Sequence, residues 1–247
     1  MTSINFKNFS NRAKGLLDNH SLFRQAIVVS LMATLMWLIY LAASWGLADY
    51  LAGQARHTMQ QWKTPELTTE AWKSNHATLT RAQYLQSNNP DILETTGQSY
   101  YLLSHSNTIT PAEKLIALQQ ALDYYLKATK QKAVSPYTWA NIAIVKSRLD
   151  QYDTQLLTAL EYATLLGPWE PFVQGAVVEV GLAAWYRFPK EERKKGRQIV
   201  FEAIERGMQK QARLMGQLIK RHQREWVICA YSGTTRKMAD FCQSIRG

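Results

Sequence analysis

The sequence predicts an all-α protein in which one N-terminal transmembrane helix is followed by antiparallel helical hairpins. Three observations support this fold class. A run of 24 uncharged and mostly apolar residues extends over residues 25–48. From residue 66 onward, prolines recur between segments whose apolar residues have helical spacing. No part of the sequence sustains the two-residue alternation that is typical of a half-buried strand.

The composition is that of a folded protein with a positive surface. Of the 247 residues, 46% are hydrophobic and 19% are charged, which argues against wholesale disorder. This length fits one ordinary domain with an appendage rather than a large multidomain enzyme. The formal net charge of +10 favours anionic partners, although charge alone does not choose among phospholipid, acidic polysaccharide and nucleic acid.

The uncharged run is long enough to cross a bilayer. As a helix with a rise of about 1.5 Å per residue, its 24 residues exceed the roughly 20 that the hydrocarbon core requires. Trp37, Tyr40 and Trp45 lie in its C-terminal half, roughly where an aromatic belt is expected. The alternative is a cleavable signal peptide, but the apolar region of such peptides has only about 7 to 15 residues. We therefore expect an uncleaved anchor.

The flanking charges predict how the anchor is oriented. Four basic residues precede it against one acid, whereas the far side opens with Asp49. By the positive-inside rule, residues 1–24 form a cytoplasmic N-terminal segment and residues 25–48 the transmembrane helix of a single-pass bacterial inner-membrane protein. Residues 49–65 are then expected to be a linker, and residues 66–247 a periplasmic helical domain. A protein with one span has no transport path of its own, so a role in export would require partners.

Prolines and capping residues divide the outer region into helices. Thr110, Pro111 and Glu113 have the pattern of a capping box with a proline at the first helical position. The expected helices cover residues 66–87, 91–104, 111–131, 137–150, 153–166, 171–187, 190–206, 208–230 and 235–245.

Two of these hairpins have small and aromatic residues at the spacing that is typical of tetratricopeptide repeats. Gly97 and Tyr100 have the spacing of a first helix in such a repeat. The second-helix spacing of four then three residues occurs twice, at Ala121, Tyr125 and Ala128 and again at Leu156, Leu160 and Ala163. We therefore expect a tetratricopeptide-like superhelix. The alternative is a nonrepetitive helical bundle, which uses the same residue types for packing.

The sequence contains no recognisable catalytic or metal-binding motif. No two of the five histidines stand three to five residues apart, and there is no phosphate-binding glycine loop, nucleophile elbow or Cys-x-x-Cys. Glu191 and Glu192 are adjacent carboxylates, but the basic residues around them indicate a solvated start of a helix. We expect a protein that is not an enzyme and that has no cofactor.

Positive charge is concentrated in the last quarter of the chain. Residues 187–247 contain 15 Lys and Arg against 6 Asp and Glu, a net charge of +9. An anionic contact is expected at Arg213, Lys220, Arg221 and Arg224, on a helix whose other face can pack. The alternative is a merely solvated face. Lipid, an anionic glycan and a protein are the candidate partners, whereas nucleic acid is disfavoured outside the cytoplasm.

Cys229 and Cys242 are the only cysteines, and both are expected in an oxidising compartment. A turn expected at residues 232–235 would bring them together in a helical hairpin. We favour a disulfide, and the alternative is a pair of buried free thiols.

The stretch Leu-Leu-Gly-Pro-Trp-Glu-Pro at residues 165–171, together with the anchor and the degenerate repeats, resembles the VpsP family of tetratricopeptide-like proteins from bacterial exopolysaccharide gene clusters. The resemblance extends over nearly the whole chain, but its motif is short. Pro168 and Pro171 are expected to set a rigid corner, Gly167 to end the preceding helix and Trp169 to fill the corner.

The resemblance implies a non-catalytic scaffold that assists the assembly or export of a polysaccharide beside a membrane polymerase or glycosyltransferase. It brings no catalytic residues with it. The alternative is an accessory subunit of another envelope complex, for translocation, cell division or respiratory or oxidase assembly.

Overall fold

The structure is a computed structural model, and it describes residues 6–230 and 235–246. Within these ranges the regular elements are ten α-helices and one short 3-10 helix, with no strand. The expected all-α class is therefore confirmed for the described residues. Residues 232–234 of the expected turn and the first five residues of the expected cytoplasmic segment lie outside them.

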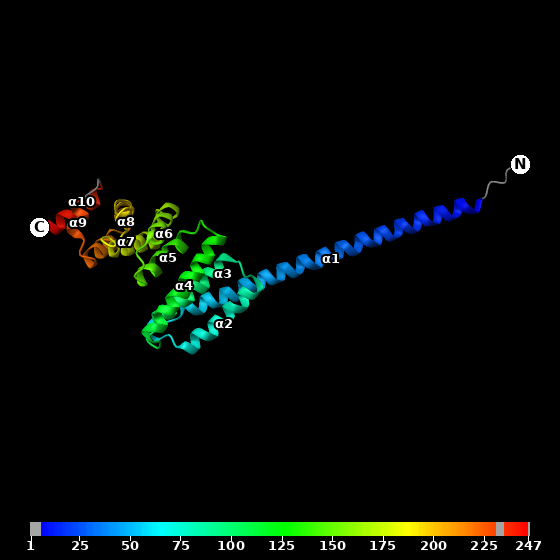
Figure 1. Cartoon of the computed structure of the whole chain (residues 1–247), viewed down its shortest axis with the longest axis horizontal. Coiled ribbons are helices and arrows are strands. Elements are labelled where there is room, and N and C mark those ends of the chain that lie inside the picture. Colours follow the sequence, from blue (N-terminus) through cyan, green and yellow to red (C-terminus); the bar gives the residue numbers. More distant parts are fainter. Residues whose placement is uncertain (1–5, 231–234, 247) are drawn as a thin grey trace.

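The first helix, α1 (Phe6–Gln60), is 55 residues long, which corresponds to about 80 Å. Its N-terminal part extends alone from the rest of the molecule, and its last turns pack beside α2 and α3 (Figure 1). The side chains of residues 23–39 are exposed, whereas Ala48, Ala52 and Ala55 are fully buried. Among the described residues, α1 is the one helix that is long and apolar enough to cross a membrane.

The expected linker at residues 49–65 is wrong for most of its length, because α1 continues as a helix to Gln60. Residues 61–68 connect α1 to α2, and they include a short 3-10 helix at Thr64–Glu66. The reason is the spacing of small residues at positions 48, 52 and 55, which gives this part of α1 one narrow face that α2 can approach closely. The candidate membrane helix is thus also the first helix of the domain that follows it.

Six further helices follow in order, and consecutive helices pack in pairs, α1 with α2, α3 with α4 and α5 with α6. Their ends agree with the expected ones to within four residues. The bounds are α2 (Thr69–Leu85), α3 (Pro90–Ser104), α4 (Pro111–Gln131), α5 (Pro136–Arg148), α6 (Thr154–Leu166) and α7 (Pro171–Ala183). The expected capping box of α4 is present, because the Thr110 hydroxyl accepts from the Glu113 amide and the Glu113 carboxylate accepts from the Thr110 amide.

The C-terminal region differs from the expected pair of helices at 190–206 and 208–230. Helix α8 (Arg193–Arg221) runs through Gly207, has a non-helical residue at Gln211, and is followed by α9 (Glu225–Ala230) and α10 (Arg236–Arg246). Gly207 lies within α8, and Met215 packs so closely over it that a side chain there would collide. The chain turns instead after Arg221, where Gln223 has φ of 54°.

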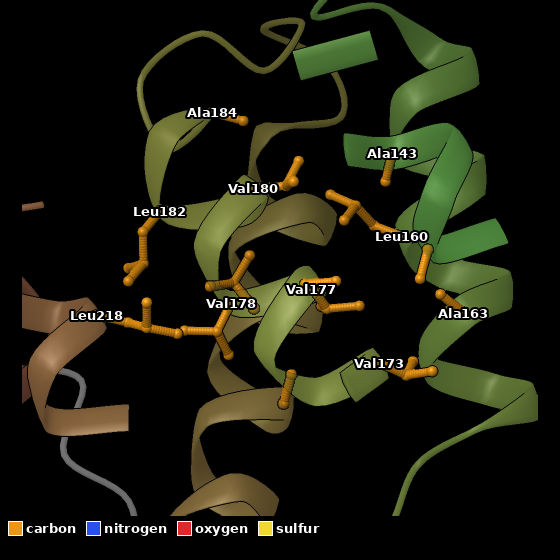
Figure 2. Packing of buried hydrophobic residues seen from close by; sticks show 14 of the residues in the cluster. Ala143, Leu160, Ala163, Val173, Val177, Val178, Val180, Leu182, Ala184 and Leu218 are labelled. Atoms are coloured by element: carbon orange, nitrogen blue, oxygen red, sulfur yellow. The ribbon is translucent and has the colours of Figure 1, made fainter. Parts of the chain in front are cut away.

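The largest core lies where α5, α6, α7 and α8 meet. In Figure 2, Val173 and Val177 of α7 point toward Leu160 and Ala163 of α6 on one side, while Val178 and Leu182 point toward Leu218 of α8 on the other. Helix α7 is therefore buried on both sides. This burial explains why the sequence of α7 is apolar with a single charged residue, although the helix is too short to cross a membrane.

Lys146 of α5 is a charged residue buried within this domain, with 2% of its surface exposed. Its Nζ donates to Asp153 Oδ2 at 2.9 Å, to Gln155 Oε1 at 2.9 Å and to Gln151 Oε1 at 3.1 Å. All three donor hydrogens thus have acceptors. The Asp153 carboxylate also caps α6 by accepting from the Leu156 amide.

Replacing Asp153 with asparagine should destabilise the protein by about 1–3 kcal/mol, because the buried Lys146 cation would lose its counter-charge. The loss of stability should be smaller than for breaking a fully buried ion pair, since the Asp153 side chain is 54% exposed. Equilibrium unfolding in urea measures it. In a Lys146→Met background the same substitution should cost much less, and equal costs in both backgrounds would contradict the coupling.

This pair also predicts a pH dependence of stability. Burial alone would raise the pKa of Asp153, but the hydrogen bonds from Lys146 and the Leu156 amide outweigh it, so the pKa lies below its ordinary value of 3.8. A carboxylate with a lowered pKa in the folded state stabilises the protein above its unfolded-state pKa, and this contribution is lost as the pH falls through the folded-state pKa. The Asp153→Asn variant should therefore lose less stability than the parent below about pH 4.

Candidate binding edge

Three helices of the outer domain begin with proline at the same edge of the molecule. Helices α3, α5 and α7 start at Pro90, Pro136 and Pro171, where the missing N–H of proline costs no helical hydrogen bond. Asn89 and Ser135 cap the first two of these helices with their side chains. We call the three preceding turns, residues 86–89, 132–135 and 167–170, together with the flanking helix ends, the turn edge.

Side-chain contacts join successive turns of the turn edge. Lys132 Nζ lies 3.5 Å from Asp91 Oδ1, and the Thr138 hydroxyl donates to Glu94 Oε2 at 2.7 Å. Farther along, the Tyr137 hydroxyl donates to Glu170 Oε2 at 2.7 Å. These contacts fix the starts of α3, α5 and α7 beside one another, so the turn edge is one continuous surface.

Two ionisable groups at this edge have shifted pKa values. Burial raises the pKa of Glu94, partly offset by the hydrogen bond from Thr138. The hydrogen bond to the Glu170 carboxylate raises the pKa of the Tyr137 hydroxyl, since it favours the protonated phenol. Both side chains thus take part in the hydrogen bonds that connect successive turns of the edge.

Large apolar side chains are exposed along the turn edge. The Tyr137 and Phe172 rings stack with centroids 6.0 Å apart, and Lys210 Nζ of α8 lies 5.5 Å from the centroid of the Trp169 ring. The exposed apolar side chains of the edge are Tyr84, Val134, Tyr137, Leu165, Trp169 and Phe172. Such a series of exposed aromatic and aliphatic groups, interrupted by polar ones, is typical of a binding surface.

The corner at residues 167–171 differs from expectation in two respects. Gly167 follows the last residue of α6 as expected, but its φ is −129°, so the position does not require the left-handed conformation. Glycine is needed there because Pro136 packs against it, and a Cβ atom would lie 2.7 Å from Pro136 Cβ. Trp169 does not fill the corner, since it is 45% exposed on the turn edge.

Polar contacts rather than an aromatic ring secure this corner. The buried Gln174 side chain donates to the Pro168 carbonyl at 2.8 Å. Gln211, the non-helical residue of α8, donates to the Pro171 carbonyl and to Gln174 Oε1, both at 3.0 Å. The distortion of α8 therefore coincides with its attachment to the corner.

The structure separates the four residues of the expected anionic contact. Arg213 and Lys220 are exposed on α8, seven residues apart and so on the same helix face. Arg221 Nη1 lies 3.3 Å from Glu179 Oε2 of α7. Arg224 lies beyond the end of α8, where its guanidinium is 4.7 Å from the centroid of the Tyr186 ring. The four therefore do not share one helix, and two of them already have partners within the protein.

This arrangement predicts unequal effects of substitution. Replacing Arg213 and Lys220 with alanine should weaken binding to vesicles containing phosphatidylglycerol, or to an acidic glycan, at low salt, and the fold should persist because both side chains are exposed. Replacing Arg221 and Arg224 should weaken binding less. Cosedimentation over a series of salt concentrations measures both variants. Binding by the Arg213 and Lys220 variant that equals the parent's at low salt would show that these residues form only a solvated face.

Cys229 of α9 and Cys242 of α10 are joined by a disulfide, with a Cα–Cα distance of 5.6 Å. Both are buried, and α10 also contacts α8, where Gly216 leaves room for the Phe241 ring. The bridge thus connects the last described helix to the end of the domain.

Sequence reasoning missed the turn edge and the buried Lys146. A signal for the edge was available, because an aromatic residue directly follows the helix-starting proline at Tyr137 and at Phe172. No signal distinguished Lys146 from a surface lysine, since its three acceptors follow it in an ordinary polar turn. Within the described residues there is also no group of three or more His, Cys, Asp or Glu that could hold a metal ion.

Over residues 6–230 and 235–246, the fold and the turn edge define an all-helical protein with one candidate membrane helix, which is continuous with the domain that follows it. Comparison of the sequence with models of protein families gave no match, and comparison with curated proteins gave none either.

Proposed function

We propose that the protein is a non-catalytic, membrane-anchored scaffold that assists exopolysaccharide biosynthesis or export, with α1 in the bacterial inner membrane and the outer domain in the periplasm. Its partners are membrane proteins of a polysaccharide assembly complex, and an anionic glycan is a further candidate ligand. The observation that carries this proposal is the turn edge, a continuous surface with exposed aromatic side chains on a domain attached to a membrane helix.

The attachment of the domain to α1 supports an anchored scaffold rather than a tethered, freely moving module. Ala48, Ala52 and Ala55 of α1 are buried against the outer helices, so no flexible linker separates the bilayer from the domain. A partner in the same membrane would therefore meet the turn edge at a defined height and orientation.

The packing of the hairpins supports a tetratricopeptide-like arrangement. Tyr125 of α4 packs so closely on Gly97 of α3 that a Cβ atom there would lie 3.0 Å from the ring. The residues with the spacing of a second repeat helix, at 121, 125 and 128 and at 156, 160 and 163, are all buried. Helix α5 packs on both α4 and α7, as the first helix of a repeat does when repeats stack.

Photocrosslinking from the turn edge tests the proposal. A photoreactive phenylalanine analogue at Phe172, which is 50% exposed, should crosslink in cells to a polymerase, glycosyltransferase or export component of polysaccharide synthesis. The matched control is Ile116, which is 62% exposed near the start of α4, at the opposite end of that helix from the turn edge. It should give none of these adducts.

Two outcomes would overturn the assignment. Adducts from Phe172 with translocation, cell-division or respiratory or oxidase components alone would favour the accessory subunit of another envelope complex. The same adducts from Phe172 and Ile116 would mean that the turn edge has no special part in binding.

A further inference from the structure

The end of the turn edge that lies nearest to α1 meets the membrane helix at an open cavity. This cavity has a volume of about 810 Å³ and is lined by Trp45, Gly46 and Asp49 of α1 and by residues 85–91 of the α2–α3 turn. The turn therefore lies beside the last residues of the apolar run rather than above them. Figure 1 shows the same relation, with the α2–α3 connection at the side of the domain from which α1 projects.

Packing holds the α2–α3 turn at this position. Leu85, the last residue of α2, packs with Leu51 against a small core that contains Ala48 and Ala52 of α1 and Ile92 of α3. Asn89 caps α3 and its amide also donates to Gln86 Oε1 at 2.6 Å. Because both sides of the turn are fixed to α1, its height along α1 is fixed as well.

The length of the apolar run places this height at the surface of the bilayer. Asp49 marks the first charge after the run, and about 20 helical residues fill the hydrocarbon core. If the core began at residue 25 it would end near residue 44, and if it began at residue 29 it would end near residue 48. Trp45 to Asp49 spans about 6 Å, which is comparable with the thickness of one headgroup layer.

The chemistry of the turn suits a headgroup layer. Residues 85–90 carry no charge, and they offer amide and hydroxyl groups that can hydrogen-bond to phosphate and glycerol oxygens. Tyr84, which precedes them, is 91% exposed, and tyrosine combines an apolar ring with a hydroxyl as interfacial residues do. The neighbouring charge at Asp91 lies 3.5 Å from Lys132 Nζ.

We infer that the α2–α3 turn, with Tyr84 at its start, is inserted in the phospholipid headgroup layer around α1 and thereby fixes the orientation of the outer domain on the bilayer. This inference rests on the proposed membrane anchoring of α1. Its occupant is lipid, and it needs no second protein.

Spin labels on the full-length chain test the inference. Ser87→Cys, Glu70→Cys and Ile39→Cys each place a nitroxide at an exposed position, on the turn, at the far end of α2 and within the apolar run, while the disulfide remains oxidised. Ser87 and Glu70 are about 25 Å apart along α2. The protein is reconstituted in vesicles of phosphatidylethanolamine and phosphatidylglycerol with a small fraction of a nickel-chelating lipid, whose headgroup accelerates the relaxation of nearby nitroxides.

The expected result is a severalfold stronger effect of the nickel lipid on the Ser87 label than on the Glu70 label, together with a high oxygen accessibility of the Ile39 label. Equal nickel effects at Ser87 and Glu70, with Ile39 still in hydrocarbon, would overturn the inference and leave the anchor intact. An Ile39 label that is accessible to water would overturn the anchoring itself, and the inference with it.

Discussion

Replacing Trp185 with alanine is expected to lower the free energy of unfolding by about 3–5 kcal/mol, the usual cost of removing a buried tryptophan side chain. Trp185 is 1% exposed and lies just after α7, where it belongs to the same core as Phe188 and Val200. The Arg197 guanidinium lies 5.3 Å from the centroid of the Trp185 ring, and Arg197 Nε donates to the Trp185 carbonyl. The substitution would thus leave a cavity at the junction of α7 and α8.

Trp226 provides the matched control, because the same substitution there removes a side chain that is 72% exposed. Trp226→Ala should change the free energy of unfolding by less than about 0.5 kcal/mol. Urea unfolding of the full-length protein in detergent, followed by circular dichroism, measures both variants. A small effect at Trp185, or equal effects at the two positions, would contradict the packing described for the α7 and α8 junction.

Removing the disulfide is the second large effect expected. Cys229 and Cys242 are 13 residues apart in the sequence. A crosslink that closes a loop of this size lowers the conformational entropy of the unfolded chain, which raises the free energy of unfolding by about 3 kcal/mol. We expect Cys242→Ala to destabilise the attachment of α10 to α8 and α9, where Met238 is fully buried. Helices α2 to α6 should be unaffected, because α10 packs on α8 and α9.

Hydrogen exchange of the full-length protein in detergent measures this effect helix by helix. The amides of α10 should exchange faster in Cys242→Ala and, equally, in the parent after reduction of the disulfide. Cys242→Ala combined with Cys229→Ala serves as the control for the loss of one thiol alone. Unchanged exchange in α10 after reduction would show that packing alone holds this helix.

Local sequence features were sufficient to predict most helix ends of the outer domain. Proline at a first helical position, together with a preceding capping residue, acts over one turn of the chain, so Pro90, Pro111 and Pro136 mark their helices without reference to the rest of the fold. The uncharged run at residues 25–48 is equally local, since its length and apolarity alone make it a candidate span.

Features that depend on two distant segments were predicted poorly. Gly167 was expected to end a helix and does so, but glycine is needed there because Pro136, 31 residues earlier in the chain, packs against it. Two separate helices were expected on either side of residue 207, whereas α8 runs through that position and has its non-helical residue at Gln211, which donates to the Pro171 carbonyl of α7. In both cases the decisive contact comes from another helix, which no local pattern records.

Local capping, periodicity and apolar length were enough to predict from the sequence a helical chain with a candidate membrane helix, and both features are present in the described residues. Three other features are visible only in the packed structure: α1 continues into the domain that follows it, Lys146 is buried with three acceptors, and aromatic residues from separate turns form one edge. The physical reason is that burial and adjacency are properties of packed pairs of helices. A lysine or an aromatic residue has the same preference for helical structure whether or not another helix covers its side chain.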